Sequence, residues 1–155
     1  MSDIEVVPLC VRAARADDLD AVLAVHDLHL GRPSPRPPTE RERASWDLMM
    51  NTPGATVYLG WIGGDAVGTA TAVLIPSVAS DGAPSVLVEA VVTVPHRRRQ
   101  GIATAIMGEI LADARARGCN KVQLLSHKRH AMDGAHDLYR RLGFEAEAEG
   151  FRFHL

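Results

Sequence analysis

The sequence predicts a single α/β (α+β) domain, and three observations lead to that expectation. The chain has 155 residues, of which 46% are hydrophobic, and this is enough for one compact domain with a proper core. Short β-branched segments alternate along the chain with longer segments of helical spacing. No internal repeat, low-complexity tract or linker interrupts that order, so the domain is expected to cover residues 1–155.

The N-terminal part predicts a strand followed by a helix. Residues 9–12 predict the short first strand. Asp17 or Asp18 is placed to cap the helix. The apolar positions of that helix fall mostly on one face, and they are Leu19, Val22, Leu23, Val25 and Leu28.

A proline-rich segment separates this helix from a second one. Residues 31–38 cannot form regular structure, because proline at this density removes backbone donors. Thr39 followed by Glu42 has the spacing of a capping box, which predicts a helix through about Met50. The proline-rich segment is the part of the chain that we expect to move.

The middle of the chain predicts three strands. Residues 56–62 and 66–74 predict two of them, and residues 63–65, Gly-Gly-Asp, predict the hairpin turn that joins them. After a polar loop over residues 76–84, residues 86–94 predict a further strand.

The C-terminal third alternates helices and strands. A helix is predicted from about residue 100 to 117, then a strand over 121–125. A second helix over about 133–142 and a last strand over 150–155 follow. The predicted order is β-α-α-β-β-β-α-β-α-β.

Charge and cysteine content narrow the class of protein. A formal net charge of −2 and an isoelectric point near 6.4 argue against a general nucleic-acid binder, and no apolar run is long enough to span a membrane. Two cysteines, Cys10 and Cys119, cannot form a disulfide scaffold. The acidic start, Met1–Glu5, lacks the basic and apolar regions of a secretory signal. We therefore expect a cytoplasmic protein whose partner is a small molecule.

The stretch from His96 to Thr104 is the most informative part of the sequence. It follows an apolar strand, contains three consecutive arginines and reaches a helix start through Gly101. Such a turn combines free backbone N–H groups, the positive end of a helix dipole and cationic side chains, which suits a phosphate or pyrophosphate. A helix N-terminus with solvated arginines is the alternative at this point.

Three segments, in matching order along the chain, resemble the GNAT superfamily of N-acetyltransferases. Arg98-x-x-Gly101-x-Ala103 resembles its acyl-CoA signature. Residues 11–19 look like its opening strand and helix, and residues 138–144 look like its closing Tyr-x-x-x-Gly-Phe segment. The resemblance covers nearly the whole chain and implies a central mixed, mostly antiparallel sheet flanked by four helices.

The resemblance also implies that acetyl-CoA is the co-substrate. The fourth strand would lie beside the pantetheine arm, and one of its backbone N–H groups would polarise the thioester carbonyl. The valines of this strand are also typical of a buried strand. The two roles are compatible, because the side chains would pack in the core while the backbone binds the cofactor. The residues implied in cofactor binding are Val91, Val92, Thr93, Arg98, Arg99, Gln100, Gly101, Ile102, Ala103 and Thr104.

Two residues are implied in catalysis. Tyr139 would protonate the departing thiolate, and its alternative role is that of an aromatic residue packed in the core. Glu89 could take the proton of the ammonium group directly or through water, because an acidic residue inside an apolar strand is costly unless it is solvated or used. Strand alternation would place it on the face of Leu87, Val91 and Thr93, and a buried salt bridge is its alternative role.

The sequence departs from the family pattern at two positions. Ala103 stands where the family commonly has glycine, which is a minor change. Met132 stands where the family often has an asparagine that contacts coenzyme A, so that contact is in doubt, and Asp133 could start the helix instead.

The resemblance implies an acetyl-CoA-dependent N-acetyltransferase of EC class 2.3.1, in which a small-molecule primary amine attacks directly in a ternary complex. A non-catalytic acyl-CoA-binding sensor and a transferase acting on a peptide or protein amine are the alternatives. Residues 88–92 and 118–122 look like the glucosamine-6-phosphate acetyltransferase branch, and residues 127–130 could then meet a substrate phosphate or form a solvated loop. The acceptor pocket is expected from the loops 31–38 and 76–84 and the C-terminal strands.

Other chemistry has little support in the sequence. His26 and His29, like His127 and His130, have helical spacing but lack a third ligand or paired cysteines, so no metal site is expected. Cys119 is expected to be a packed thiol. Edge strands could support a homodimer.

Overall fold

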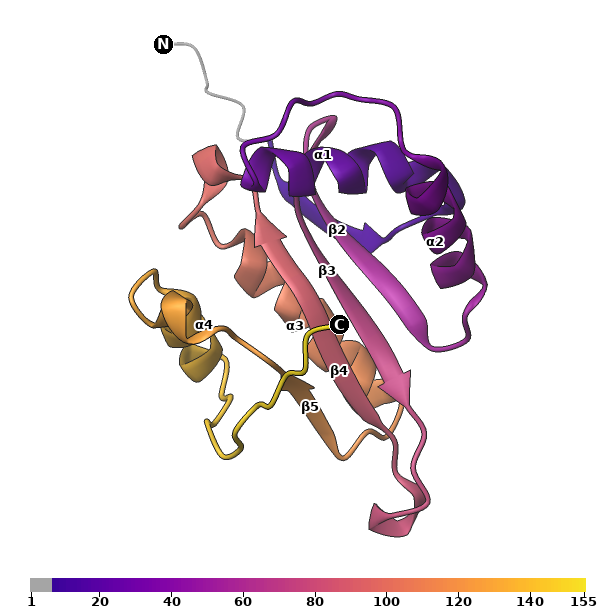
Figure 1. Ribbon diagram of the computed structural model, residues 1–155. Helices are drawn as coiled ribbons and strands as arrows, with labels where there is room; N and C mark the ends of the chain where they lie inside the picture. Colours follow the sequence, from indigo (N-terminus) through magenta and orange to yellow (C-terminus); the bar gives the residue numbers. More distant parts are fainter. Residues whose placement is uncertain (1–6) are drawn as a thin grey trace. The chain divides into compact units, whose positions relative to one another are not determined.

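The computed structural model describes residues 7–155, which form four helices, five strands and several short 3-10 turns (Figure 1). The described chain divides into two compact units, the first ending at Gln123 and the second covering Leu124–Leu155. The acidic start, Met1–Glu5, which lacks the basic and apolar regions expected of a secretory signal, lies outside the described residues. Within the described residues, no helix has the length and apolar character needed to cross a membrane.

The sheet follows the order of the sequence. Its strands are β1 (Leu9–Ala13), β2 (Ala55–Ile62), β3 (Asp65–Ile75), β4 (Ser85–Thr93) and β5 (Lys121–Leu124), arranged β1-β2-β3-β4-β5. The pairs β1–β2, β2–β3 and β3–β4 are antiparallel, whereas β5 runs in the same direction as β4 (Figure 1). The predicted mixed, mostly antiparallel sheet is therefore confirmed, as is the hairpin that joins β2 to β3.

The predicted last strand is wrong. Residues 150–155 form no strand, although Phe151, Phe153 and Leu155 have the spacing of one. These three side chains are almost fully exposed, at 88%, 88% and 116%. A strand needs a neighbouring edge to satisfy its backbone groups, and the described part of the second unit offers no strand of its own apart from the end of β5.

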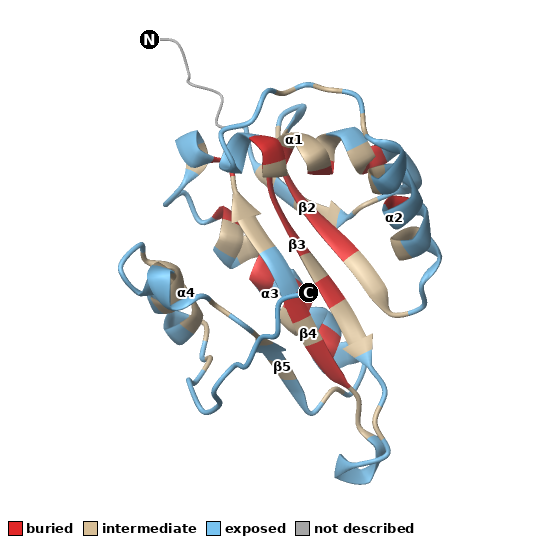
Figure 2. Cartoon of the chain, in the orientation of Figure 1, coloured by how far each residue is buried: buried red, intermediate tan, exposed pale blue. Residues whose placement is uncertain are grey.

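Helices cover both faces of the sheet in the first unit. Helices α1 (Leu19–His29) and α2 (Glu40–Asn51) lie on one face, where Val57 and Leu59 of β2 form a buried cluster with Val22 and Trp46. Helix α3 (Ile102–Ala116) lies on the other face, and its Ile102, Ile106, Met107 and Ile110 are buried (Figure 2). Each such side chain contributes roughly 1.5–3 kcal/mol when it leaves water.

The two predicted helix starts differ in their chemistry. The capping box of α2 is confirmed, because Glu42 N donates to Thr39 Oγ1 at 3.1 Å and Thr39 N donates to Glu42 Oε2 at 2.7 Å. Asp18 occupies the N-cap of α1, but its carboxylate does not cap that helix. It accepts two hydrogen bonds from Arg12, at 2.6 and 3.0 Å, and one from Arg15 N at 2.7 Å.

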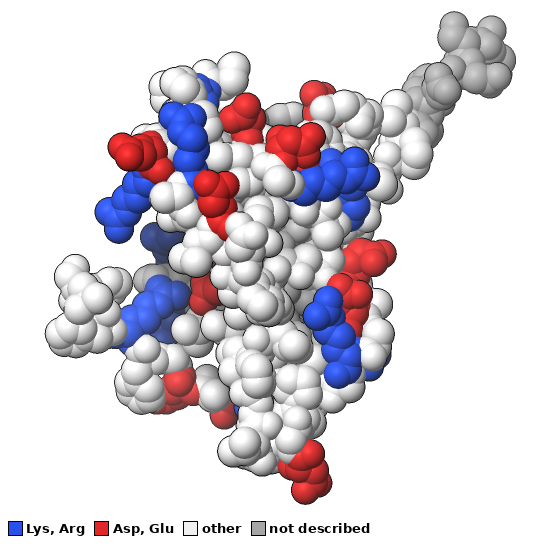
Figure 3. All heavy atoms as spheres, turned by 90° about the vertical axis from the view of Figure 1, so that its right-hand side faces the viewer, with Lys and Arg blue, Asp and Glu red and all other residues white. Residues whose placement is uncertain are grey.

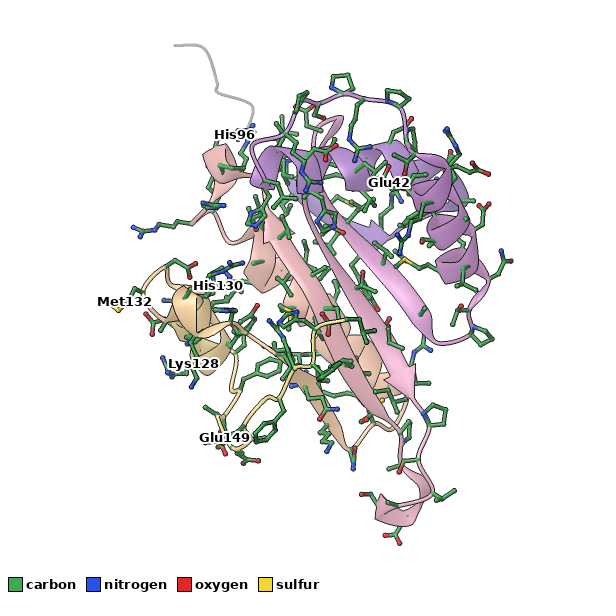
Figure 4. All side chains as sticks on the ribbon, viewed as in Figure 1. Glu42, His96, Lys128, His130, Met132 and Glu149 are labelled. Carbon is green, nitrogen blue, oxygen red and sulfur yellow. The ribbon has the colours of Figure 1, made fainter. Side chains whose placement is uncertain are left out.

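The second unit holds one short helix. Helix α4 covers Ala135–Arg141, which is shorter than the predicted 133–142. Gly134 is the N-cap of this helix, and Asp133, one residue earlier, accepts a hydrogen bond from Ala135 N at 3.1 Å without being the cap itself. Residues 127–134, with Lys128, His130 and Met132, form the loop and 3-10 turn before it (Figure 4).

Candidate active site

The loop between β4 and α3 forms an open turn. It begins with a 3-10 turn at Pro95–Arg97, which contains His96 (Figure 4). Arg99 and Gly101 then adopt left-handed backbone conformations, with φ of 61° and 78°. Glycine adopts this conformation without strain, whereas arginine does so at a cost of about 1–2 kcal/mol. Helix α3 follows at Ile102, two residues later than predicted.

The backbone N–H groups of this turn are unpaired. Over residues 7–155, no protein acceptor bonds the N–H groups of residues 99 to 104, and the next one, Ala105 N, bonds Gly101 O at 2.9 Å. The first N–H groups of a helix have no partner within the helix, and they carry the positive end of its dipole. The turn therefore offers a row of donors with the chemistry to bind an anion.

The three arginines of the turn lie in different environments. Arg98 and Arg99 are exposed, whereas Arg97 is half-buried and its Nε has no hydrogen-bonding partner among the described residues. Arg98 Nη2 lies 3.1 Å from His29 Nδ1 at the end of α1. The contact links the side chain of Arg98 to the C-terminal end of α1.

A β-bulge interrupts β4 next to this turn. Thr71 lies opposite Glu89 and Thr69 lies opposite Val92, so Ala90 and Val91 together face the single residue Ala70. Ala90 has a left-handed backbone, with φ of 53°. A bulge of this kind leaves backbone groups outside the ladder, at the strand segment that the family resemblance implies beside a thioester.

The bulge corrects the predicted orientation of Glu89. Residues directly opposite each other in an antiparallel pair share a face, so Glu89 shares a face with Val92 and not with Val91 and Thr93. Glu89 is exposed and makes no ion pair with any described residue, so the alternative of a buried salt bridge is wrong.

A cavity of about 440 Å³ lies on the α1 and α2 face of the sheet. Thr71 and Ala90 line it from the sheet, next to Glu89 and on the bulge. Its remaining lining residues come from α1, α2 and β2, and they are Leu19, Val22, Leu23, His26, Arg41, Glu42, Ser45, Trp46, Met49 and Val57. Neither the loop 31–38 nor the loop 76–84, from which the acceptor pocket is predicted, contributes to this lining.

His26, considered from the sequence only as a metal ligand, is a polar group in this lining. It lies half-buried on α1, seven residues after Leu19 and three after Leu23, which also line the cavity. Burial, and to a lesser degree the neighbouring His29, lowers the pKa of His26, so its imidazole is neutral at pH 7. A neutral imidazole accepts a proton, and the helical spacing of these three residues is the signal that could have identified it.

An arginine fixes the proline-rich segment against both helices. Arg36 Nε lies 2.8 Å from Asp27 of α1, and its Nη1 and Nη2 donate to Glu42 of α2 at 2.9 and 2.7 Å. Asp27 is 2% exposed, so the pair anchors the segment in the core. Glu42, in the cavity lining, lies where α1 and α2 meet (Figure 4), and the Arg36 guanidinium lowers the pKa of Glu42 to about 2.

Tyr139 lies on α4 in the second unit. Its half-buried ring stands edge-on to Phe144, with ring centroids 5.9 Å apart. Burial raises the pKa of Tyr139, so the phenol keeps its proton at neutral pH, and its hydroxyl bonds no residue within 7–155. The first unit thus contains the turn, the bulge, Glu89 and the cavity, whereas Tyr139 belongs to the second unit.

Neither sign of charge dominates the side of the molecule that carries α2, in agreement with the small net charge of the chain. Acidic and basic side chains are interspersed there around a largely uncharged area (Figure 3). No group of three or more histidine, cysteine, aspartate or glutamate side chains within 7–155 is placed to hold a metal ion.

Comparisons with known proteins agree with this architecture. The model of the acetyltransferase (GNAT) family matches residues 22–144, while no curated protein sequence matches the chain. An inferred acetyltransferase from Agrobacterium tumefaciens str. C58 is 27% identical, with a TM-score of 0.84 over 94% of this chain and 99% of that one. An acetyltransferase from Trypanosoma brucei is 26% identical, with a TM-score of 0.78 over 96% of this chain and 100% of that one.

The glucosamine-6-phosphate N-acetyltransferase of Arabidopsis thaliana is also a structural neighbour. It has a TM-score of 0.78 over 95% of this chain and 98% of that one, but only 11% identity, so it supports the fold alone. The family match spans the bulge, the turn, α3 and Tyr139. The chain belongs to the GNAT family of acetyltransferases.

Proposed function

We propose that this chain transfers an acetyl group from acetyl-CoA to the primary amine of a small molecule by direct attack in a ternary complex. The observation that carries the proposal is the row of unpaired N–H groups at residues 99–104, between a bulged strand and a helix start. A pyrophosphate matches such a row in charge and in hydrogen-bonding chemistry.

The turn and the bulge would divide the binding of acetyl-CoA between them. Arg98 and Arg99 supply positive charge beside the pyrophosphate, and the N–H groups of Gln100, Gly101, Ile102, Ala103 and Thr104 supply donors. The strand segment Val91–Thr93 lies along the pantetheine arm, and a backbone N–H freed by the bulge polarises the thioester carbonyl. Donors held rigidly in place stabilise the negative charge that develops on that oxygen.

The proposed transfer conserves atoms and electrons. The amine lone pair forms the new N–C bond, the C–S bond breaks, and the thiolate leaves with the electron pair. Glu89 takes the proton lost by the amine, directly or through water, and Tyr139 donates its proton to the thiolate. Because an ordinary thiol has a pKa of about 8.5, the thiolate is a fair leaving group and the acid contributes modestly.

Calorimetry with acetyl-CoA and a thiol-release assay over a panel of amines test the proposal together. We expect heat of binding, and thiol release that depends on the amine. Binding without turnover on small amines or peptide amines would support the alternative of an acyl-CoA sensor, and turnover on peptides alone would support a protein or peptide acceptor. Absence of binding contradicts the proposal. The cytoplasmic location and the homodimer stay predictions.

A further inference from the structure

The cavity is built from two apolar helix stripes that face the sheet. On α1 the stripe includes Leu19, Val22 and Leu23, and on α2 it includes Trp46 and Met49. Residues three and four apart on a helix lie on one side, so α1 presents a continuous apolar surface, and Trp46 and Met49 add an apolar patch on α2. A volume of about 440 Å³ lies in the range of small-molecule sites.

The charged groups of the lining do not match a polycation or a sugar phosphate. Glu42 is its one carboxylate among the described residues, and Arg36 and Thr39 N already bond both of its oxygens. Arg41 is its one guanidinium, and this residue is exposed. A polycationic amine needs several carboxylates, and a phosphate needs several cations or N–H donors, because charges taken from water must be paired.

The polar groups of the lining suit a single amine. His26, half-buried and neutral, can accept one hydrogen bond from the N–H of an amine, while Ser45 and Thr71 add hydroxyl groups. Ala90 places the bulge in the same lining, so an amine in the cavity lies on the side of the sheet where the bulge opens the ladder.

From this lining we infer that the acceptor is a monoamine carried on a compact apolar body, aromatic or branched aliphatic. The inference rests on the proposed function, since it names the acceptor class of the same transfer. The apolar body packs between α1 and α2, and the amine meets His26 and the bulge.

A panel of acceptors tests the inference. With acetyl-CoA at saturation, we expect kcat/KM for 2-phenylethylamine and 3-methylbutylamine to exceed that for kanamycin and glucosamine 6-phosphate at least tenfold. 2-Phenylethanol, which lacks the amine, is expected to bind in calorimetry and to compete with the amine but not with acetyl-CoA. A preference for kanamycin or glucosamine 6-phosphate overturns the inference.

Matched variants locate the binding site. Leu23→Ala removes part of the apolar wall, and we expect it to raise the KM for 2-phenylethylamine about fivefold, as the loss of a half-buried leucine contact implies. Leu28→Ala, on the same helix but 41% exposed and outside the lining, is the control and leaves KM unchanged. Equal KM values for the two variants overturn the inference.

A second pair protects the test against misfolding. Met49→Glu places a carboxylate in the lining, and Leu48→Glu places one at a neighbouring position that is 69% exposed. We expect only Met49→Glu to abolish 2-phenylethanol binding, with acetyl-CoA affinity kept. Intact acetyl-CoA binding with an unaltered response to 2-phenylethanol contradicts the acceptor class alone, whereas loss of acetyl-CoA binding in the parent protein contradicts the proposed function.

Discussion

Gly68 of β3 lies directly beneath Ile102, the first residue of α3. A methyl group added at Gly68 would lie 2.6 Å from Ile102 Cγ2, 3.0 Å from Ile106 Cδ1 and 3.2 Å from Val92 O. Gly60 lies opposite Gly68 in the sheet, and its added methyl would meet the same two isoleucines at 3.4 Å. This glycine pair lets the first turn of α3 approach the sheet, which fixes where the unpaired N–H groups of the turn lie.

Gly68→Ala should therefore weaken acetyl-CoA binding. The added methyl forces Ile102 away from the sheet, at a cost of about 1–3 kcal/mol in stability. We expect the Kd for acetyl-CoA to rise about tenfold, which corresponds to about 1.4 kcal/mol. Calorimetry measures it, with Gly64→Ala as the control because an added methyl there meets no atom within 4 Å. If Gly68→Ala folds and its Kd is unchanged, the packing of α3 on the sheet does not determine how the turn binds acetyl-CoA.

Ala90→Gly should stabilise the protein. Ala90 holds a left-handed backbone at the bulge, which costs alanine about 1 kcal/mol relative to glycine. We expect a gain of about that size in the free energy of unfolding, measured by urea denaturation, and a loss for Ala90→Val, whose branched side chain tolerates the conformation less. Ala44→Gly, exposed within α2, is the control and should lose about 0.5–1 kcal/mol. If Ala→Gly lowers the free energy of unfolding at both positions, the backbone of Ala90 is not strained at the bulge.

Much of the fold could be predicted because its signals are local. The Thr39 and Glu42 spacing, the Gly-Gly-Asp turn and the glycine before α3 each determine a backbone conformation within a few residues. These features appear in the structure within one or two residues of their predicted positions. The turn could be predicted for the same reason, since its unpaired N–H groups follow from a helix start.

The features that were missed depend on contacts between distant residues. The bulge at Ala90 arises from the register of β3 against β4, which strand alternation alone does not show. The cavity lining comes from helices and strands as far apart in sequence as Leu19 and Ala90. Residues 150–155 have the alternation of a strand but no edge to pair with inside their own unit. Periodicity shows which residues are expected to be buried, but it does not show which element packs against them.

Acid should destabilise the protein between about pH 4.5 and pH 2. The pKa of Glu42 falls from 4.5 to about 2 on folding, because Arg36 and Thr39 N bond its carboxylate. The pKa of Asp18 is also lowered, mainly by Arg12. In that window the unfolded chain binds more protons than the folded one, so stability is present above it and is lost as the pH falls. Urea unfolding at pH 5 and pH 3 measures the loss.

Glu42→Gln separates the contribution of Glu42 from the rest. We expect a smaller difference between pH 5 and pH 3 than in the parent protein, because Glu42 no longer titrates. Glu40→Gln serves as the control. The carboxylate of Glu40 lies in the same helical turn but forms no ion pair with any described residue. A pH difference that stays the same in Glu42→Gln would show that the contact with Arg36 does not persist in solution.

Arg98→Ala should weaken acetyl-CoA binding in a salt-dependent way. We expect the Kd to rise about tenfold at low salt and by less at high salt, because charge-assisted bonds contribute about 1.5–3 kcal/mol and salt screens exposed charges. Calorimetry at two ionic strengths measures it. Arg115→Ala, exposed in the last turn of α3, is the control. Equal losses in both variants would point to net charge and not to the turn.

Tyr139→Phe should lower kcat and leave the Kd for acetyl-CoA unchanged. Burial raises the pKa of Tyr139, so the phenol stays protonated across the neutral range and can donate to a thiolate. We expect kcat to fall about tenfold to a hundredfold in the thiol-release assay, which is at or below the lower end of the usual range for general acid catalysis, because thiolate leaves readily. A sensor would show no such loss.

The other tyrosine of the chain provides the matched control. The Tyr58 hydroxyl donates to Asp113 of α3, so Tyr58→Phe should lower the free energy of unfolding by about 1 kcal/mol and leave kcat unchanged. Tyr139→Phe should show the reverse, since its hydroxyl bonds no residue within 7–155. A stability loss in Tyr139→Phe with an intact kcat would make Tyr139 a packing residue, and the thiolate would then take its proton from water.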